Sequence, residues 1–158
     1  MENIDKFNYY VALIFARLQR NFPERVNVTG PDMFGGTSCE STIDAAGRYT
    51  GKYLVDGEVQ DLRNDLDFLW ATTRWLIDTG YLIGSAKNEM AGRVCHVTLS
   101  PKALEVLKAA PSSISAERSL GDDLEEAMST AAKDKLAEIA GTGLTWLFKV
   151  GWGAVGAV

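Results

Sequence analysis

The sequence has few of the residues that form metal centres and disulfide frameworks, with two cysteines and one histidine in 158 residues. Cys39 and Cys95 lie far apart, and neither belongs to a Cys-x-x-Cys pair or to a Cys/His cluster of zinc-ligand spacing. We therefore expect no bound metal, no cofactor and a fold that is stable without a disulfide. Unpaired cysteines of this kind are typical of a reducing compartment.

The N-terminus has no apolar leader. Its first seven residues, Met-Glu-Asn-Ile-Asp-Lys-Phe, are polar and acidic, whereas a signal peptide begins with a basic region and continues with an apolar run. The expected location is the cytoplasm.

Motifs of enzyme catalysis are absent as well. The sequence contains neither the glycine-rich loop of a phosphate or dinucleotide site nor a nucleophile motif. His96 alternates with apolar residues in a predicted strand, where a single histidine is more often a strand residue with one hydrogen bond than a catalytic base. We expect no catalytic residues and no enzymatic activity.

There is no excess of basic charge. The chain has 16 basic and 21 acidic residues, and its formal net charge is -5. Residues 61–110 carry six of each sign, so the acidic excess lies toward the two ends. Because a phosphate backbone attracts cationic faces, this balance argues against strong nonspecific binding of nucleic acid but leaves room for a local basic patch.

The sequence does have the composition of a globular domain, with 46% hydrophobic and 23% charged residues. Its length suits one domain with an appendage. We expect a domain over residues 1–110, a linker over 111–118 and a C-terminal helical and apolar extension over 119–158.

Two amphipathic helices are predicted inside the domain, over residues 5–22 and 62–79, because apolar side chains recur there at three- and four-residue spacing. Gly80 is placed to end the second helix as a left-handed cap. Trp75 is expected to be buried between the first helix and a hairpin. The apolar stripe of the first helix consists of Phe7, Tyr10, Val11, Ile14, Phe15, Leu18 and Phe22.

Strands are predicted where polar and β-branched apolar residues alternate. Residues 25–28 form a short strand, and residues 81–83 and 93–99 form a β-hairpin around a turn over 85–92. Ser100 then caps a further helix that starts at Pro101.

The segment between the first strand and the second helix is an insertion rich in glycine. Six glycines leave little room for a long helix over residues 29–57. We expect a loop with one helical turn near 31–34 and a short pairing near 49–55. A loop of this length is unusual in a compact domain, so it is a family-specific insertion whose role stays open.

Two phrases of the sequence resemble those of winged-helix proteins. In that superfamily a helix commonly ends in a leucine-rich phrase with Gly followed by an aromatic and an apolar residue. The hairpin then leads into a phrase Leu-Thr-x-Lys-Gly-x-x-x-Leu, in which Ala103 replaces the usual Gly here. The phrases in this chain are Trp75-Leu76-Ile77-Asp78-Thr79-Gly80-Tyr81-Leu82 and Leu99-Ser100-Pro101-Lys102-Ala103-Leu104-Glu105-Val106-Leu107.

The resemblance covers about residues 5–110 and implies a winged-helix-like α+β fold, mainly α with a small β-hairpin. Winged helices serve as transcription regulators and also as protein-interaction modules, so the fold alone does not select the function. The first hypothesis is a small dimeric regulator that binds double-stranded DNA. The alternative is a protein-interaction module without DNA binding, which explains the acidic composition with fewer assumptions.

In a winged helix, the helix over 62–79 takes the place of the recognition helix in the major groove. The spacing pairs Arg63 with Asp67 and Arg74 with Asp78, so a solvated face of paired charges competes with base readout. The candidate nucleic-acid-binding residues are Arg63, Asn64 and Arg74 on this helix and Lys87, Asn88 and Arg93 in the hairpin turn.

The extension is expected to begin with a helix over residues 119–140 and to end in a glycine-rich segment that is too apolar for a free tail. We expect it to join two copies of the chain; the alternative is packing on its own domain. A membrane role is disfavoured, because the apolar run is short and Lys149 interrupts it. The candidate oligomer interface consists of Leu124, Ala127, Met128, Ala131, Leu144, Trp146, Leu147 and Phe148.

Overall fold

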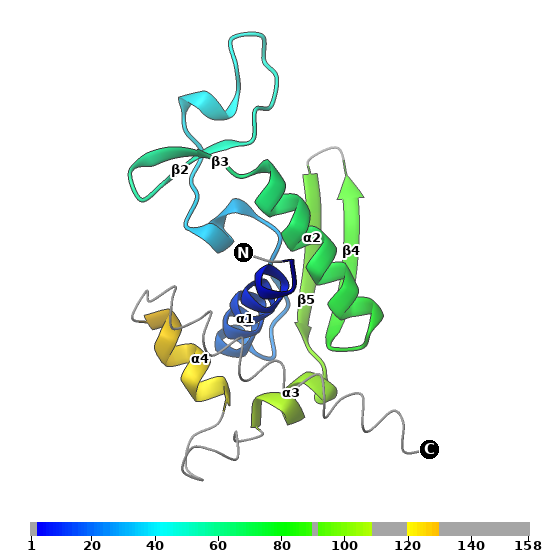
Figure 1. Ribbon diagram of the computed structural model, residues 1–158. Coiled ribbons are helices and arrows are strands. Elements are labelled where there is room, and N and C mark those ends of the chain that lie inside the picture. The colour runs from blue at the N-terminus through cyan, green and yellow to red at the C-terminus, as the bar shows by residue number, and fades with distance from the viewer. Residues whose placement is uncertain (1–2, 90–91, 109–119, 130–158) are drawn as a thin grey trace.

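The protein has an α+β fold in which helices pack on a small antiparallel sheet (Figure 1). A computed structural model describes residues 3–89, 92–108 and 120–129. The helices are α1 (Asn3–Asn21), α2 (Arg63–Asp78), α3 (Pro101–Lys108) and α4 (Leu120–Ser129), with short 3-10 helices η1 (Pro31–Phe34) and η2 (Glu40–Thr42). The strands are β1 (Val26–Asn27), β2 (Lys52–Val55), β3 (Glu58–Asp61), β4 (Leu82–Glu89) and β5 (Gly92–Leu99).

The main sheet has the strand order β1-β5-β4, and all its pairings are antiparallel. The expected short strand and hairpin are both confirmed. The turn over 85–92 is wrong in its extent, because β4 continues to Glu89 and pairs with β5 along its whole length. Lys87 and Asn88 therefore lie in a strand and not in a turn. Their segment lacks the β-branched residues that signal a strand, and pairing with β5 supplies the order that the local sequence does not.

Helix α1 is the centre of the hydrophobic core. All seven residues from Tyr10 to Ala16 are buried, which is more than one amphipathic stripe. The reason is that α2, β5 and α4 all contact α1, and Figure 1 shows it between α4 on one side and α2 with the sheet on the other. The stripe prediction is wrong only at its end, where Phe22 lies beyond the last turn of α1 and is 44% exposed.

Helix α2 buries the face that the periodicity predicts, with Leu69, Thr73 and Leu76 inside. Trp75 makes the expected contacts with both elements, since its ring meets Phe7 of α1 edge-on and stacks on Tyr81 beside β4. Its predicted burial is wrong, because the side chain is 38% exposed.

The two phrases that carry the winged-helix resemblance pack against each other at the end of α2. Gly80 adopts the left-handed conformation expected of a cap, with φ 81°. The Tyr81 N–H donates to the carbonyl of Leu76 at 2.9 Å, and the Ser100 N–H donates to the carbonyl of Tyr81 at 3.1 Å. Lys102 donates to the carbonyl of Thr79 at 3.1 Å and lies 4.1 Å from the centroid of the Tyr81 ring.

The insertion is more ordered than a loop. The expected helical turn is confirmed as η1, and the pairing near 49–55 is confirmed by strand β2 and by a bridge between Ile43 and Tyr49. The partner strand β3 is not predicted from the sequence. It forms a hairpin with β2 that turns through Asp56 and Gly57, with φ 51° and 83°. Two positive φ values are the requirement of a two-residue type I′ turn, for which Asp-Gly is a preferred pair.

Helix α4 belongs to the core of its own chain. Leu124 and Ala127 are 0% and 1% exposed in the hydrophobic cluster that includes α1 and α3. Their assignment to an oligomer interface is therefore wrong, because a side chain covered by its own domain offers no surface to a second copy. The linker over 111–118 lies outside the described residues. So do five further candidates for the interface: Ala131, Leu144, Trp146, Leu147 and Phe148. Met128 belongs to α4, but its side chain is not described.

The two cysteines differ in accessibility, which gives a direct test of the packing. Burial raises the pKa of the Cys95 thiol to about 11, whereas Cys39 is partly exposed. A thiol reacts as its thiolate, so Cys95 is protonated and unreactive at pH 8. We expect iodoacetamide at pH 8 to alkylate Cys39 alone in the native protein and both thiols in urea, as measured by mass spectrometry of the peptides. Alkylation of Cys95 in the native protein at the rate of Cys39 would contradict this packing.

Within the described ranges, no helix combines the length and the apolar character needed to cross a membrane.

Candidate binding cleft

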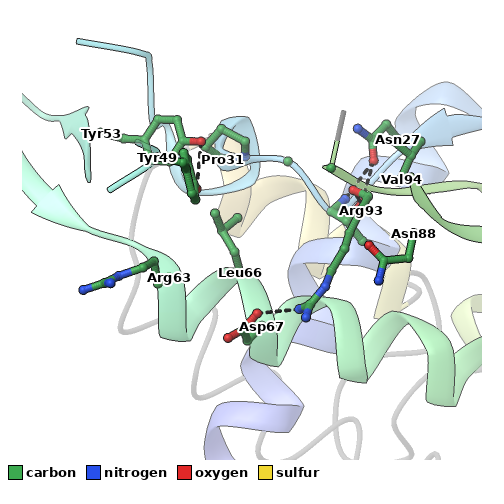
Figure 2. Close-up of a pocket in the computed structure, with 13 residues that line it drawn as sticks. Asn27, Pro31, Tyr49, Tyr53, Arg63, Leu66, Asp67, Asn88, Arg93 and Val94 are labelled. Carbon is green, nitrogen blue, oxygen red and sulfur yellow. Dashed lines mark hydrogen bonds and ion pairs between the residues drawn. The ribbon is translucent and has the colours of Figure 1, made fainter. Parts of the chain in front are cut away.

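A cleft of about 740 Å³ lies over the first half of α2, between the insertion on one side and the β4–β5 hairpin on the other. Figure 2 shows the side chains that surround it. Its lining comes from four separate parts of the chain: Asn27, Thr29, Gly30, Pro31, Tyr49, Tyr53, Arg63, Leu66, Asp67, Asn88, Gly92, Arg93 and Val94.

The floor and one wall of the cleft are apolar or aromatic. Leu66 points from α2 toward the space between the walls, and Pro31 and Tyr49 lie across from it (Figure 2). Tyr49 is 54% exposed, and its hydroxyl shares a hydrogen bond of 3.0 Å with the hydroxyl of Tyr53. Burial and this hydrogen bond raise the pKa of Tyr49, so its hydroxyl is protonated at neutral pH.

Arg93 forms the opposite wall. Its Nη1 donates to Asp67 of α2, and its guanidinium lies 5.7 Å from the centroid of the Trp70 ring. The backbone beneath it is fixed by Thr29, whose hydroxyl lies 3.0 Å from the Arg93 carbonyl oxygen and accepts the Cys95 N–H at 3.1 Å. Asp67 and Trp70 thus hold the guanidinium from two sides, over the cleft (Figure 2).

Arg63 lines the edge of the cleft with its aliphatic stem. Its guanidinium makes a two-pronged ion pair with Asp61, with N···O distances from 2.7 to 3.2 Å, and points away from Leu66 in Figure 2. This pairing raises the pKa of Arg63 and lowers the pKa of the Asp61 carboxyl. The stem lies against Gly51, where a Cβ atom would stand 1.9 Å from the Arg63 Cγ.

The structure brings half of the candidate nucleic-acid-binding residues together. Arg63, Asn88 and Arg93 all line the cleft. The other three are exposed but lie outside its lining: Asn64, Arg74 and Lys87.

The charge pairing inferred for α2 is wrong. Arg63 pairs with Asp61 and not with Asp67, and Asp67 pairs with Arg93 from the hairpin. No ion pair joins Arg74 to Asp78 in the described structure. A spacing of four residues allows a pair on a helix but does not select it when another charge lies closer in the fold.

The wall formed by the two tyrosines is not predicted from the sequence. Tyr49 and Tyr53 face the cleft only because the insertion folds back over the start of α2. Asp56-Gly57 is a strong local signal for the hairpin that positions them, whereas no local signal indicates what the hairpin packs against.

Comparison of the chain with family models, with curated proteins and with solved structures finds no match. Among the described residues, no three or more of the usual histidine, cysteine and carboxylate ligands are grouped so that they could hold a metal ion.

Proposed function

We propose that the protein is a winged-helix-like module that binds a segment of another protein in the cleft over α2. The topology supports the winged-helix part of this proposal. The chain runs through a helix, a short strand, the insertion with its β2–β3 hairpin, a second helix, the β4–β5 hairpin and a further helix. In the main sheet, β5 lies between β1 and β4. Apart from the hairpin inside the insertion, this is the order of elements that the sequence predicts for a winged-helix-like fold.

The observation that supports protein binding is that both arginines in the cleft are already ion-paired. Each already has a carboxylate partner from its own chain, Asp61 for Arg63 and Asp67 for Arg93. A DNA backbone is bound by cations that replace its counterions, and a paired arginine contributes less to that exchange. The cleft instead combines apolar and hydrogen-bonding side chains, as binding clefts generally do, and peptide segments are recognised through pockets for their side chains together with hydrogen bonds to their backbone.

Site-specific photo-crosslinking tests the proposal. A benzoylphenylalanine residue in place of Tyr49 is expected to form adducts with another protein in cells that make this protein, because the side chain stands in the cleft wall. The same residue in place of Glu24, exposed on the loop after α1, is the matched control. Adducts at Tyr49 that consist of nucleic acid, or that are no more frequent than at Glu24, would overturn the proposal.

DNA binding is the second candidate function, and one observation favours it. Arg74 and Lys87 are exposed and have no ion-pair partner in the described structure. These two cations and the neutral amide of Asn64 lie on the α2 and hairpin surfaces beyond the cleft. A transcriptional regulator of this kind would bind a pool of random duplexes at low salt, with an affinity that falls steeply as salt is raised.

We expect no mobility shift of such a pool at low salt, since the acidic and basic side chains of this surface nearly balance. A salt-dependent shift that is lost in an Arg74→Gln, Lys87→Gln double variant, but kept in an Arg25→Gln control, would favour the DNA regulator. The proposed dimer is a separate question, and light scattering of the full chain tests it.

A further inference from the structure

The Arg93 guanidinium presents an unused bidentate edge to the cleft. Only Nη1 is engaged by Asp67, and within the described residues Nε–H and Nη2–H make no hydrogen bond. These two donors form the fork that a carboxylate accepts with both of its oxygens. Because Trp70 and Asp67 already hold the guanidinium, little side-chain freedom is lost when a ligand binds.

Asn88 adds a third hydrogen-bonding group beside this edge. It pairs directly with Arg93 across β4 and β5, lines the cleft, and has no hydrogen-bond partner for its amide among the described residues. Figure 2 shows the two side chains next to each other on the same wall. An amide can donate to a carboxylate or bond to the backbone of an extended segment.

An apolar contact lies across from these polar groups. The Leu66 side chain is only partly buried, and Tyr49 and Pro31 lie opposite it over the cleft. An aliphatic side chain placed among these three would remove apolar surface of both partners from water.

From this arrangement we infer that the cleft binds a protein segment with one acidic side chain beside one aliphatic side chain, the acidic group on Arg93 and the aliphatic group on Leu66. This inference rests on the proposed function and specifies the partner of that site. The partner is a protein and not a nucleic acid, because Asp67 stands beside Arg93 and repels a chain of phosphates. A single carboxylate can accept from the Nε–H and Nη2–H edge while Asp67 stays on Nη1, so the two acidic groups share the guanidinium without competing for the same donors.

Peptide titration of the isotope-labelled full chain, followed by NMR, tests the inference. The probe is acetyl-Gly-Asp-Leu-Gly-amide, with one counterpart that has Asn for Asp and another that has Gly for Leu. The probe is expected to shift the Arg93 Nε–H and the Leu66 methyl resonances, with a dissociation constant on the order of millimolar for so short a peptide. Each counterpart is expected to bind roughly tenfold more weakly.

Two variants separate the arginine fork from simple charge. Arg93→Lys keeps the charge but removes the bidentate edge, and is expected to weaken binding of the probe about tenfold. Arg25→Lys is the control at an exposed arginine outside the cleft and is expected to change nothing. Asp67→Asn removes the neighbouring carboxylate and is expected to strengthen binding roughly threefold.

Equal binding of the probe and its Asn counterpart, or no shift at Arg93 and Leu66, would overturn the inference. The wild-type titration decides this by itself if a variant fails to fold. Inorganic phosphate that shifts Arg93 more strongly than the acidic peptide would also overturn it, in favour of DNA. A protein adduct at Tyr49 whose crosslinked segment lacks an acidic residue would leave the proposed function standing and remove only this inference.

Discussion

Replacing Leu124 by Ala is expected to lower the free energy of unfolding of the full chain by about 2–5 kcal/mol. The side chain is fully buried, and the cluster that contains it includes residues of α1 and α3. Its truncation removes apolar contacts and leaves a cavity that the neighbouring helices fill only in part. Urea unfolding followed by circular dichroism measures the loss.

The concentration dependence of this loss distinguishes the chain's own core from a dimer interface. We expect the difference between variant and wild type to be the same over a roughly hundredfold range of protein concentration, because an intramolecular contact does not follow mass action. Glu125→Ala is the control on an exposed position of the same helix and is expected to cost less than about 0.5 kcal/mol. A loss that disappears at low concentration, or a halved molar mass of the variant by light scattering, would return Leu124 to the interface between copies.

The elements that the sequence predicts well are those with a local cause. The period of apolar residues indicates α1 and α2 within two residues at each end, because one face of each helix must be buried whatever covers it. The cap at Gly80 and the start of α3 at Pro101 are equally local, and the Ala103 N–H does donate to the Ser100 hydroxyl at 3.2 Å. The conformation at these two helix ends depends only on residues that are neighbours in the sequence.

The predictions from the sequence are wrong where burial or ion pairing depends on residues far apart in the chain. In the sequence, α1 and α4 each have the pattern of a helix that is buried on one face. The packing of the two helices on each other buries a further face of α1 and covers the apolar side chains of α4. The ion pair of Asp67 with Arg93 joins residues 26 positions apart, so helical spacing gives no sign of it.

The candidate site is predicted in part for the same reason. Residue types suited to binding indicate Arg63, Asn88 and Arg93, and the structure places all three in one cleft. The apolar half of the cleft depends on the insertion folding back over α2, which brings Tyr49 toward Leu66. No residue of the insertion carries a sequence signal for that contact.

Replacing Gly84 by Ala is expected to cost about 4 kcal/mol of unfolding free energy, which approaches the whole stability of an ordinary domain. Gly84 lies inside β4 at φ 149°, a conformation that residues with a Cβ rarely adopt, and its Cβ would stand 2.1 Å from the carbonyl oxygen of His96. That oxygen belongs to the backbone of β5, so no side-chain rotation relieves the overlap and the two strands must separate. Thermal unfolding of the purified variant measures the cost.

A glycine with positive φ in open space separates the backbone strain from this overlap. Gly47 has φ 76° and nothing within 4 Å of the position of a Cβ atom, so Gly47→Ala is expected to cost only about 1 kcal/mol. If Gly84→Ala costs no more than this control, β4 does not approach β5 as closely as described. The pairing of β4 with β5 would then begin after Gly84 and not at Leu82.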